Sequence, residues 1–402
     1  MSLPEHDSMT SAERRAGVSL AAIFGLRMLG LFLILPVFAV HAHTIPGGDN
    51  LTLVGLAIGA YGLTQAFLQI AFGAASDRFG RKPVIVAGLV IFFIGSVVAA
   101  MADGIHMVIV GRVLQGAGAI SAAVIALAAD LTRDQHRTKI MAMIGASIGL
   151  VFALSMVGAP LLYSSIGMDG IFWLTAALAL GSIFVVIWVV PDAPQVPRPM
   201  GGRFVDVLRD GQLMRLNFGV FALHLIQTTM WVLVPAALVS SGNLPLAEHW
   251  KVYLPAVLLS FAVMVPAIII AERRGQMKFI FNAAIIILVL VQLGLLVYGQ
   301  SLFGLGLWLM LFFVAFNVLE ATQPSWISKI ARPDAKGTAL GVYNTLQSAG
   351  LFLGGMLGGL LAQHYGTAAV NIACAAIALV WLALAATMTP PPRRIEPAAQ
   401  AG

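Results

Sequence analysis

Residues 73–83 read Gly73-Ala74-Ala75-Ser76-Asp77-Arg78-Phe79-Gly80-Arg81-Lys82-Pro83 and lie between two long apolar runs. The stretch concentrates an acid, three bases and two glycines in a chain that is only 10% charged. Such a stretch is expected where a hydrophobic protein meets water. Gly80 suits a backbone position with positive φ, and Pro83 suits the first turn of a following helix. The residues alone therefore predict a tight charged turn between two helices.

The overall composition predicts an all-α membrane protein with many spans. Hydrophobic residues make up 59% of the chain and the mean hydropathy is +0.93, whereas a soluble domain is about half apolar and about a quarter charged. Because one spanning helix needs about 20 apolar residues, twelve helices would use roughly 240 residues and leave short loops. The polar segment 1–16 lacks the apolar core of a cleaved signal peptide. The single cysteine, Cys374, excludes a disulfide within the chain.

Twelve apolar runs are expected to form two six-helix bundles. The predicted spans are 17–42, 51–75, 83–102, 105–130, 138–163, 170–190, 216–240, 249–271, 278–298, 302–329, 337–364 and 368–388. A linker rich in proline and arginine, 191–215, with a short surface helix at 204–213, separates an N-terminal bundle, 17–190, from a C-terminal bundle, 216–388. A short tail, 389–402, follows. Pro36 is expected to kink or break the first span.

The positions of lysine and arginine predict the orientation. With the N-terminus inside, all of the 23 basic residues except Arg27, Arg112 and Lys251 fall in inner segments or at inner helix ends. Both termini are therefore expected in the cytoplasm, with the chain in a bacterial inner membrane. The basic excess serves orientation in contact with membrane lipid, and no nucleic-acid partner is expected.

The two halves repeat the same signals. Asp77-Arg78-x-Gly80 returns as Glu272-Arg273-x-Gly275, about 195 residues later and again after an apolar run. Glycines crowd the fifth and the eleventh predicted spans. Parallel six-helix repeats are the pattern of one large class of secondary transporters.

The charged turn resembles the signature Gly-x-x-x-Asp-Arg-x-Gly-Arg-Lys between helices two and three of major facilitator superfamily transporters. Its matching residues are Gly73, Asp77, Arg78, Gly80, Arg81 and Lys82. Nearly the whole chain, from about residue 13 to 389, is similar to members of the drug:proton antiporter type. The resemblance implies that Asp130 and Arg137 join the Asp77 turn in a charge network. In the family this network latches the inner side in the outward-open state. On residues alone, an ordinary charged turn remains the alternative.

Two further segments bear on that resemblance. Arg112, Gln115, Gly116 and Gly118 resemble the helix-four signature Arg-x-x-Gln-Gly-x-Gly, whose arginine is linked to proton coupling in relatives. The end of span five, with Ala159 before Pro160, departs from the antiporter pattern. This departure weakens the prediction of antiport, but it does not weaken the resemblance to the superfamily.

Polar groups inside a membrane are costly and are the default functional candidates. The proton-coupling candidates are Arg27, Arg112, Glu320 and His224. Glu320 is the most interior carboxylate, and desolvation favours the neutral form of such a group. The structural alternatives are an Arg112 that bonds neighbouring helix carbonyls and a Glu320 held in a fixed pair with an arginine or Lys329.

Other polar and aromatic side chains recur at helical spacing and would line a central cavity for an amphipathic compound. These substrate-cavity candidates are Tyr61, Gln65, Gln115, Gln227, Trp231, Asn317, Tyr343 and Gln347. The alternative for each is a hydrogen bond between helices, worth about 0.6 kcal/mol.

The sequence contains no Walker-type phosphate loop, metal-ligand spacing or nucleophile elbow, so neither an enzyme nor a cofactor or metal site is expected. The prediction is a proton-coupled transporter, acting as a monomer, that exports small drug-like compounds by alternating access. The alternatives are an uptake symporter or facilitator, and a membrane sensor that does not transport. Some relatives carry a soluble domain after the twelfth helix, and none is expected before Gly402.

Overall fold

The computed structural model describes residues 8–192, 204–299, 301–332 and 335–390, and these residues form an all-α fold, as predicted. The helices are α1 Ser11–Phe32, α2 Leu35–His41, α3 Leu51–Phe79, α4 Arg81–Ala100, α5 Ile105–Ala117, α6 Ser121–Asp130, α7 Asp134–Phe184, α8 Phe204–Arg209, α9 Gly211–Ser240, α10 Trp250–Arg274, α11 Met277–Tyr298, α12 Leu302–Ile330 and α13 Lys336–Ala386. Short helical turns lie at Ala42–Thr44 (η1), Val185–Val189 (η2, a π-helix) and Leu246–Glu248 (η3).

The described residues contain ten helical stretches apolar and long enough to span a membrane, and two of them are double spans. α7 and α13 are each 51 residues long, so a straight helix would reach about 76 Å across a hydrocarbon layer of about 30 Å. Each one turns back at a glycine with positive φ, Gly167 at 69° and Gly366 at 79°. Only glycine adopts such angles readily. The two glycines lie between predicted spans five and six and between spans eleven and twelve.

Two spans are broken in the middle. The first passes from α1 to α2 at Leu33 and Ile34, and Pro36 lies in the first turn of α2, as expected for a proline that cannot continue a helix. The fourth passes from α5 to α6 around Gly118, although a continuous span 105–130 was predicted. Gly118 packs against α4 so closely that a Cβ would lie 2.4 Å from the carbonyl oxygen of Gly88. This tertiary contact leaves no periodic signal in the sequence.

The remaining boundaries differ at the first span and at the linker. α1 begins at Ser11 instead of residue 17, because Thr10 and Glu13 form a capping box. The predicted surface helix 204–213 ends at Arg209, and α9 begins at Gly211, where Asp210 accepts hydrogen bonds from the backbone of Gln212 and Leu213. Residues 1–7, 193–203 and 391–402 of the predicted termini and linker lie outside the described residues.

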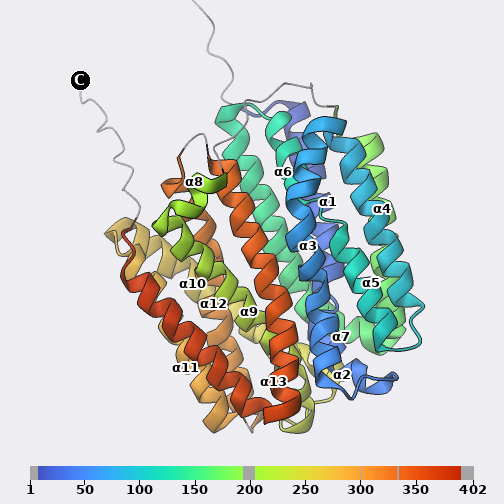
Figure 1. Ribbon diagram of the computed structural model, residues 1–402, viewed down its shortest axis with the longest axis vertical. Coiled ribbons are helices and arrows are strands. Elements are labelled where there is room, and N and C mark those ends of the chain that lie inside the picture. Colours follow the sequence, from blue (N-terminus) through green and yellow to red (C-terminus); the bar gives the residue numbers. More distant parts are fainter. Residues whose placement is uncertain (1–7, 193–203, 300, 333–334, 391–402) are drawn as a thin grey trace, which may run out of the picture.

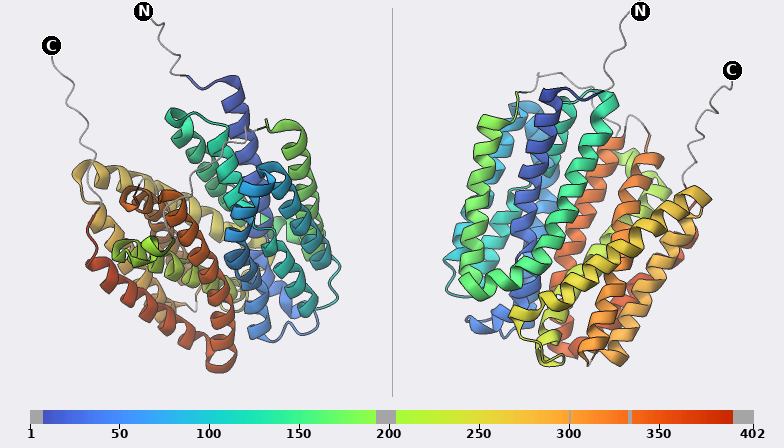
Figure 2. Two further views of the ribbon diagram at one scale, coloured as in Figure 1. Left: turned by 45° about the horizontal axis from the view of Figure 1, so that its top comes forward. Right: turned by 180° about the vertical axis from the view of Figure 1, so that it is seen from behind.

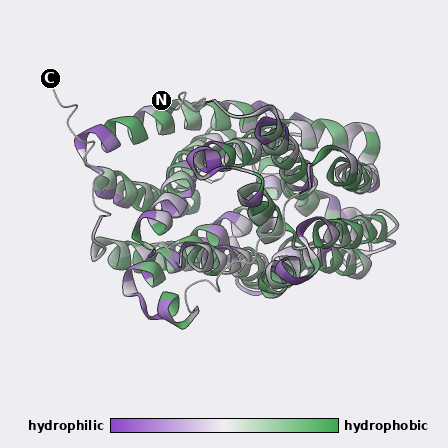
Figure 3. Ribbon diagram, turned by 90° about the horizontal axis from the view of Figure 1, so that it is seen from above, coloured by the Kyte–Doolittle hydropathy of each residue, from purple (hydrophilic) through white to green (hydrophobic). Residues whose placement is uncertain are grey.

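The helices form two bundles side by side, a first half of α1–α7 and a second half of α9–α13 (Figures 1 and 2). The start of α1 and the end of α13 lie at the same end of the molecule, here called the terminal end, and the other is called the opposite end. Hydrophobic residues predominate in the helices when the bundle is viewed along its length, with hydrophilic stretches among them (Figure 3). Many large ones face outward, among them Phe67, Trp188 and Phe303. Such a surface suits lipid, and the chain is a multi-span membrane protein.

The two halves meet most closely where α3 crosses α13 toward the opposite end. A Cβ at Gly55 would lie 2.0 Å from the carbonyl oxygen of Gly355, and one at Gly359 would lie 2.1 Å from that of Leu51. The backbone N–H of Leu51 also donates to Gln363 Oε1 at 2.7 Å. Small residues let the backbones of membrane helices touch in this way. By contrast, Gly145, Gly149 and Gly158 in the matching stretch of α7 have no atom within 4 Å of a Cβ position.

Candidate functional site

The charged turn lies at the terminal end, and Arg81 is its centre. Gly80 joins α3 to α4 with φ of 93°, so its predicted positive φ is confirmed. The Arg81 guanidinium lies 2.5 Å from Asp77 Oδ1 and 3.0 Å from Asp130 Oδ2, and it also donates to Ser76 Oγ at 2.6 Å. The structure therefore brings three of the predicted latch residues, Asp77, Arg81 and Asp130, into one cluster.

The other latch candidates lie around this cluster. Lys82 Nζ is 2.6 Å from Asp192 Oδ1, just after the last turn of the sixth span. The Arg78 guanidinium lies 5.3 Å from the centre of the Phe79 ring. Arg137 donates to the carbonyl of Ala129 at 3.3 Å, and Gly73 is in ordinary contact with α6. The ion pairs of Asp77, Arg81 and Lys82 all join residues of the first half.

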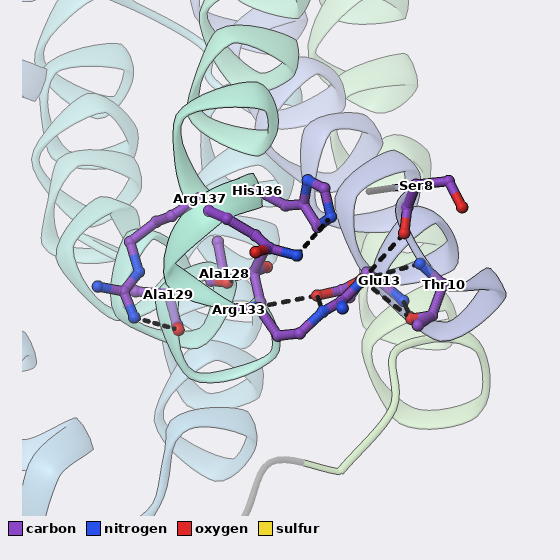
Figure 4. Close-up of polar contacts among 10 residues, drawn as sticks. Ser8, Thr10, Glu13, Ala128, Ala129, Arg133, His136 and Arg137 are labelled. Atoms are coloured by element: carbon purple, nitrogen blue, oxygen red, sulfur yellow. Dashed lines mark hydrogen bonds and ion pairs between the residues drawn. The ribbon is translucent and has the colours of Figure 1, made fainter. Parts of the chain in front are cut away.

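A second ionic contact at the terminal end was not predicted. Glu13 accepts hydrogen bonds from Arg133 Nε at 2.9 Å, from Arg133 Nη2 at 2.9 Å and from the Arg133 backbone N–H at 3.0 Å (Figure 4). Glu13 also closes the capping box with Thr10. The Arg133 guanidinium holds the pKa of Glu13 well below its usual range, with the Thr10 hydrogen bonds acting in the same direction. The pair fastens the start of α1 to the turn before α7, and no local sequence pattern links residues so far apart.

Arg27 and Arg112 are buried inside the first half, and both contact the ring of Tyr61. Arg27 donates to Ser121 Oγ at 3.1 Å and to Gln65 Oε1 at 3.3 Å. The centre of the Tyr61 ring lies 5.6 Å from the Arg27 guanidinium carbon and 5.2 Å from that of Arg112. Within the described residues, neither guanidinium has a carboxylate partner.

The hydrogen bonds of Arg112 reach its own helix and the neighbouring helix α3. Its Nη1 donates to Gln115 Oε1 at 2.8 Å, and its Nε donates to the carbonyl of Ala57 on α3 at 3.3 Å. Gln115 in turn donates to Ser96 Oγ on α4 at 2.9 Å. The arginine thus bonds a neighbouring helix, as the structural alternative expected, yet it remains a buried cation without a counter-ion. Ser96 and Ser121 were not recognised from the sequence, since a lone serine in an apolar helix gives no signal.

Three polar side chains from three helices meet inside the second half. Gln347 Nε2 of α13 lies 2.7 Å from His224 Nε2 of α9 and 3.4 Å from Glu320 Oε1 of α12. His224 Nε2 is 3.6 Å from Glu320 Oε2. The Glu320 side chain is 37% exposed, whereas that of His224 is 5% exposed, so the cluster opens on the side of the carboxylate. The partners found for Glu320 are therefore Gln347 and His224, in place of the arginine or Lys329 considered from the sequence.

Aromatic rings next to this cluster pack against each other across the boundary between the halves. Phe152 of α7 packs 5.8 Å from Phe313 and 6.3 Å from Phe316, both on α12, and 5.2 Å from Phe32 of α1. Phe316 also contacts the His224 ring at 5.8 Å. Phe32 and Phe152 were not predicted, because an aromatic residue in an apolar helix has no signature.

The remaining cavity candidates lie in the same half. Asn317 donates to Ser260 Oγ of α10 at 2.9 Å, which is the interhelical hydrogen bond considered as its alternative. Trp231 packs between Tyr253 and Phe313. Gln227 and Tyr343 are buried. Two surface hollows, of about 330 Å³ near Pro46 and about 310 Å³ near Phe72, lie away from this cluster. In the part of the chain that the structure describes, no three His, Cys, Asp or Glu side chains are grouped to hold a metal ion.

Comparison with known proteins supplies the family. Residues 18–354 and 321–402 match the Major Facilitator Superfamily. The chain is 46% identical to the inner membrane transport protein YajR of Escherichia coli (strain K12), over 96% of this chain and 85% of that protein. It is 27% identical to the multidrug resistance protein MdtH of Yersinia enterocolitica, over 83% of this chain and 82% of that protein. A bacterial homologue of the human lysosomal transporter Spinster, in an inward-facing and occupied conformation, shares the fold with a TM-score of 0.76 at 12% identity, covering 94% of this chain and 97% of that one. The resemblance of the charged turn is therefore confirmed.

Proposed function

The chain belongs to the major facilitator superfamily, and on that premise we propose that it exports small amphipathic compounds in exchange for protons, by alternating access in a bacterial inner membrane. YajR is named as an inner membrane transport protein and MdtH as a multidrug resistance protein. These names support location and substrate class without fixing either for this chain.

The observation that carries the proposal is the cluster of Glu320, His224 and Gln347. A carboxylate that faces a histidine at 3.6 Å inside an apolar bundle is a functional candidate, because ionisable groups are rare and costly there. Its partial exposure gives access from one side, whereas His224 behind it is shielded. In our proposal Glu320 exchanges its proton when the substrate passes, and His224 shares that proton. Arg112 and Arg27 raise the electrostatic cost of a further positive charge in the first half.

The contacts between the halves support an arrangement closed at the opposite end. There α3 and α13 touch through Gly55, Gly355 and Gly359, and Phe152 packs against Phe313 across the boundary. At the terminal end, the ion pairs of Asp77, Arg81 and Lys82 stay inside the first half. We propose that the terminal end is cytoplasmic and open in this conformation.

In the outward-open state, the charged turn would contact the second half and latch the cytoplasmic side. A latch worth a few kcal/mol is enough to shift such an equilibrium. The buried side chains Tyr61, Gln65, Gln115, Gln227, Trp231, Asn317 and Tyr343 are proposed to contribute to the cavity walls as the halves rock. A proton crossing 100 mV supplies about 2.3 kcal/mol to this cycle.

The proposal is tested in proteoliposomes with a trapped pH dye, screened with lipophilic cations such as tetraphenylphosphonium and with sugars. We expect proton movement opposite to that of the compound. Movement of both in the same direction would establish a symporter. Compound movement without protons would establish a facilitator. Specific binding without any flux, in protein shown to be folded, would favour the sensor.

A further inference from the structure

The hydrogen bonds of His224 fix which ring nitrogen carries its proton. Nδ1 lies 3.0 Å from the carbonyl oxygen of Val220, one turn earlier on α9. A carbonyl oxygen only accepts hydrogen bonds, so Nδ1 must be the donor. In the neutral ring, Nε2 is then an acceptor, and it faces Gln347.

The Gln347 amide nitrogen fits this arrangement, because it has two hydrogens to donate. One points toward His224 Nε2 at 2.7 Å and the other toward Glu320 Oε1 at 3.4 Å. Both donations favour the unprotonated forms, a neutral imidazole and an ionised carboxylate. The observed amide orientation is therefore matched to a cluster that has not taken up a proton.

The opposite orientation suits a loaded cluster. A proton on His224 Nε2 would set a donor against the Gln347 amide hydrogens at 2.7 Å. Rotation of the amide by half a turn about its last torsion, a roughly two-fold torsion, brings Oε1 to the ring instead. In that orientation Oε1 accepts from a protonated His224, and it also accepts from Glu320 when the carboxyl carries a proton.

We propose that the Gln347 side-chain amide is a two-position switch that sets the proton occupancy of the His224–Glu320 pair. The inference rests on the proton-carrying role proposed above for that pair, and it makes Gln347 a positioning residue that carries no proton itself.

The position of Gln347 on α13 links this switch to the interface between the halves. Two turns further along the same helix, Gly355 lies against the backbone of α3, and Gly354 lies against the carbonyl of Leu225 on α9. An amide that turns with proton uptake therefore belongs to the helix that contacts both the first half and the helix of His224.

No other charge competes at this point of α9 within the described residues. Glu320 is the titratable side chain beside His224, Tyr343 lies near Glu320, and Phe316 packs edge-on against the His224 ring. His224 lies about 20 Å along α9 from Gly211, at 1.5 Å per residue. The other titratable groups on elements packed against α9 lie in the first half, at helix ends or turns, or, for Cys374, beside Thr229. They are Asp206 and Arg209 of α8, Glu248 of η3, His41 of α2, Tyr61, Asp77 and Arg78 of α3, Lys329 of α12, and Lys336, His364, Tyr365 and Cys374 of α13.

The experiment is a pH titration of the His224 ring by ¹⁵N NMR on the full chain labelled with ¹⁵N-histidine, in detergent and without substrate. His224→Asn assigns the signal. In the wild type at alkaline pH, we expect the hydrogen on Nδ1. In Gln347→Leu, the ring loses both the hydrogen bond that its neutral form accepts and the one that its protonated form donates, so the titration midpoint should stay within about one pH unit of the wild-type value. Gln347→Glu sets a carboxylate against Nε2 and should raise the midpoint.

A glutamine at the far end of α9 supplies the matched control, since Gln212→Leu removes an amide that contacts Thr389. Its His224 midpoint should equal that of the wild type. The signals of the other histidines report whether each variant is folded. A wild-type ring with hydrogen on Nε2 would overturn the switch. So would a Gln347→Leu midpoint more than one pH unit above the wild-type value, which is the result for an amide that only donates, or a Gln347→Glu midpoint that does not exceed the wild-type value. Because no transport is measured, this result is independent of whether the chain exports its substrate with protons.

Discussion

Replacement of Gly355 with alanine is expected to shift the protein toward the state that is open at the opposite end. A Cβ on residue 355 would lie 2.3 Å from the carbonyl oxygen of Gly55 and 2.8 Å from the backbone nitrogen of Gly59. Backbone atoms of a helix cannot rotate away as a side chain does. An ordinary contact begins near 3.4 Å, so α3 and α13 must separate by about 1 Å.

The magnitude follows from the cost of overpacking, typically about 1–3 kcal/mol. That cost falls only on the state in which the two helices touch. It therefore changes the equilibrium between the two states by about 5- to 150-fold in favour of the other one. The effect should appear as a change in population with little loss of folding.

The assay is electron–electron spin distance measurement in a Cys374→Ala background. Exposed labels at residues 103 and 364 report the opposite end, and exposed labels at 139 and 329 report the terminal end. Gly355→Ala should lengthen the first distance and shorten the second. Gly341→Ala is the matched control on the same helix, since no atom lies within 4 Å of a Cβ there. Distances in Gly355→Ala equal to those of the control, in folded protein, would show that the contact between α3 and α13 does not set this equilibrium.

Four further substitutions separate stability from transport. Asp77→Asn removes a pair on a side chain that is 65% exposed, so we expect less than about 1 kcal/mol of lost stability but slower cycling. Arg81→Ala should cost about 1–3 kcal/mol, because it removes the guanidinium that joins Asp77, Ser76 and the partly buried Asp130. Equal thermal shifts in the two variants would argue against Arg81 as the centre of the cluster. Arg112→Leu should abolish proton-coupled flux. Its thermal midpoint should stay near that of the wild type, because loss of the hydrogen bonds to Gln115 and Ala57 is offset by relief of the cost of burying a cation. A large fall in the midpoint would favour the structural interpretation. Glu13→Gln should lower the thermal midpoint at pH 7, by the equivalent of about 1 kcal/mol. Because the pKa of folded Glu13 is low, the stability contributed by its ionised form is complete above the unfolded pKa of about 4.3 and decreases as the pH falls below that value. A difference in thermal midpoint between Glu13→Gln and the wild type that does not narrow below pH 4 would contradict the Arg133 pairing.

Glycine and proline predicted a turn and a helix break correctly. Gly80 and Pro36 act through backbone angles that few residues or one ring impose, so their effects are local and could be predicted. The break at Gly118 could not be predicted, because it depends on the approach of Gly88 from another helix. The Glu13–Arg133 pair could not be predicted for the same reason, since its partners meet only after the first half has packed.

The residues of the candidate site could likewise be predicted one by one but not as a cluster. Glu320, His224 and Gln347 were each singled out as polar residues in apolar helices, but their meeting was not foreseen. A helix that is apolar on all sides has no stripe to fix its rotation. The rotation of α13 is set instead by glycine contacts with α3 and α9, and only these contacts bring Gln347 between the other two side chains.

The proton-carrying role of Glu320 is tested most directly by Glu320→Gln in proteoliposomes, using a compound that moves protons in the wild type. Proton flux driven by that compound and exchange of labelled for unlabelled compound are measured side by side. We expect Glu320→Gln to lose the proton flux and to keep the exchange. Glu248→Gln, which removes a carboxylate from the exposed pair with Lys251 at the opposite end, should keep both. Proton flux in Glu320→Gln equal to that of the wild type would contradict the proton-carrying role of Glu320 and leave it with a structural role.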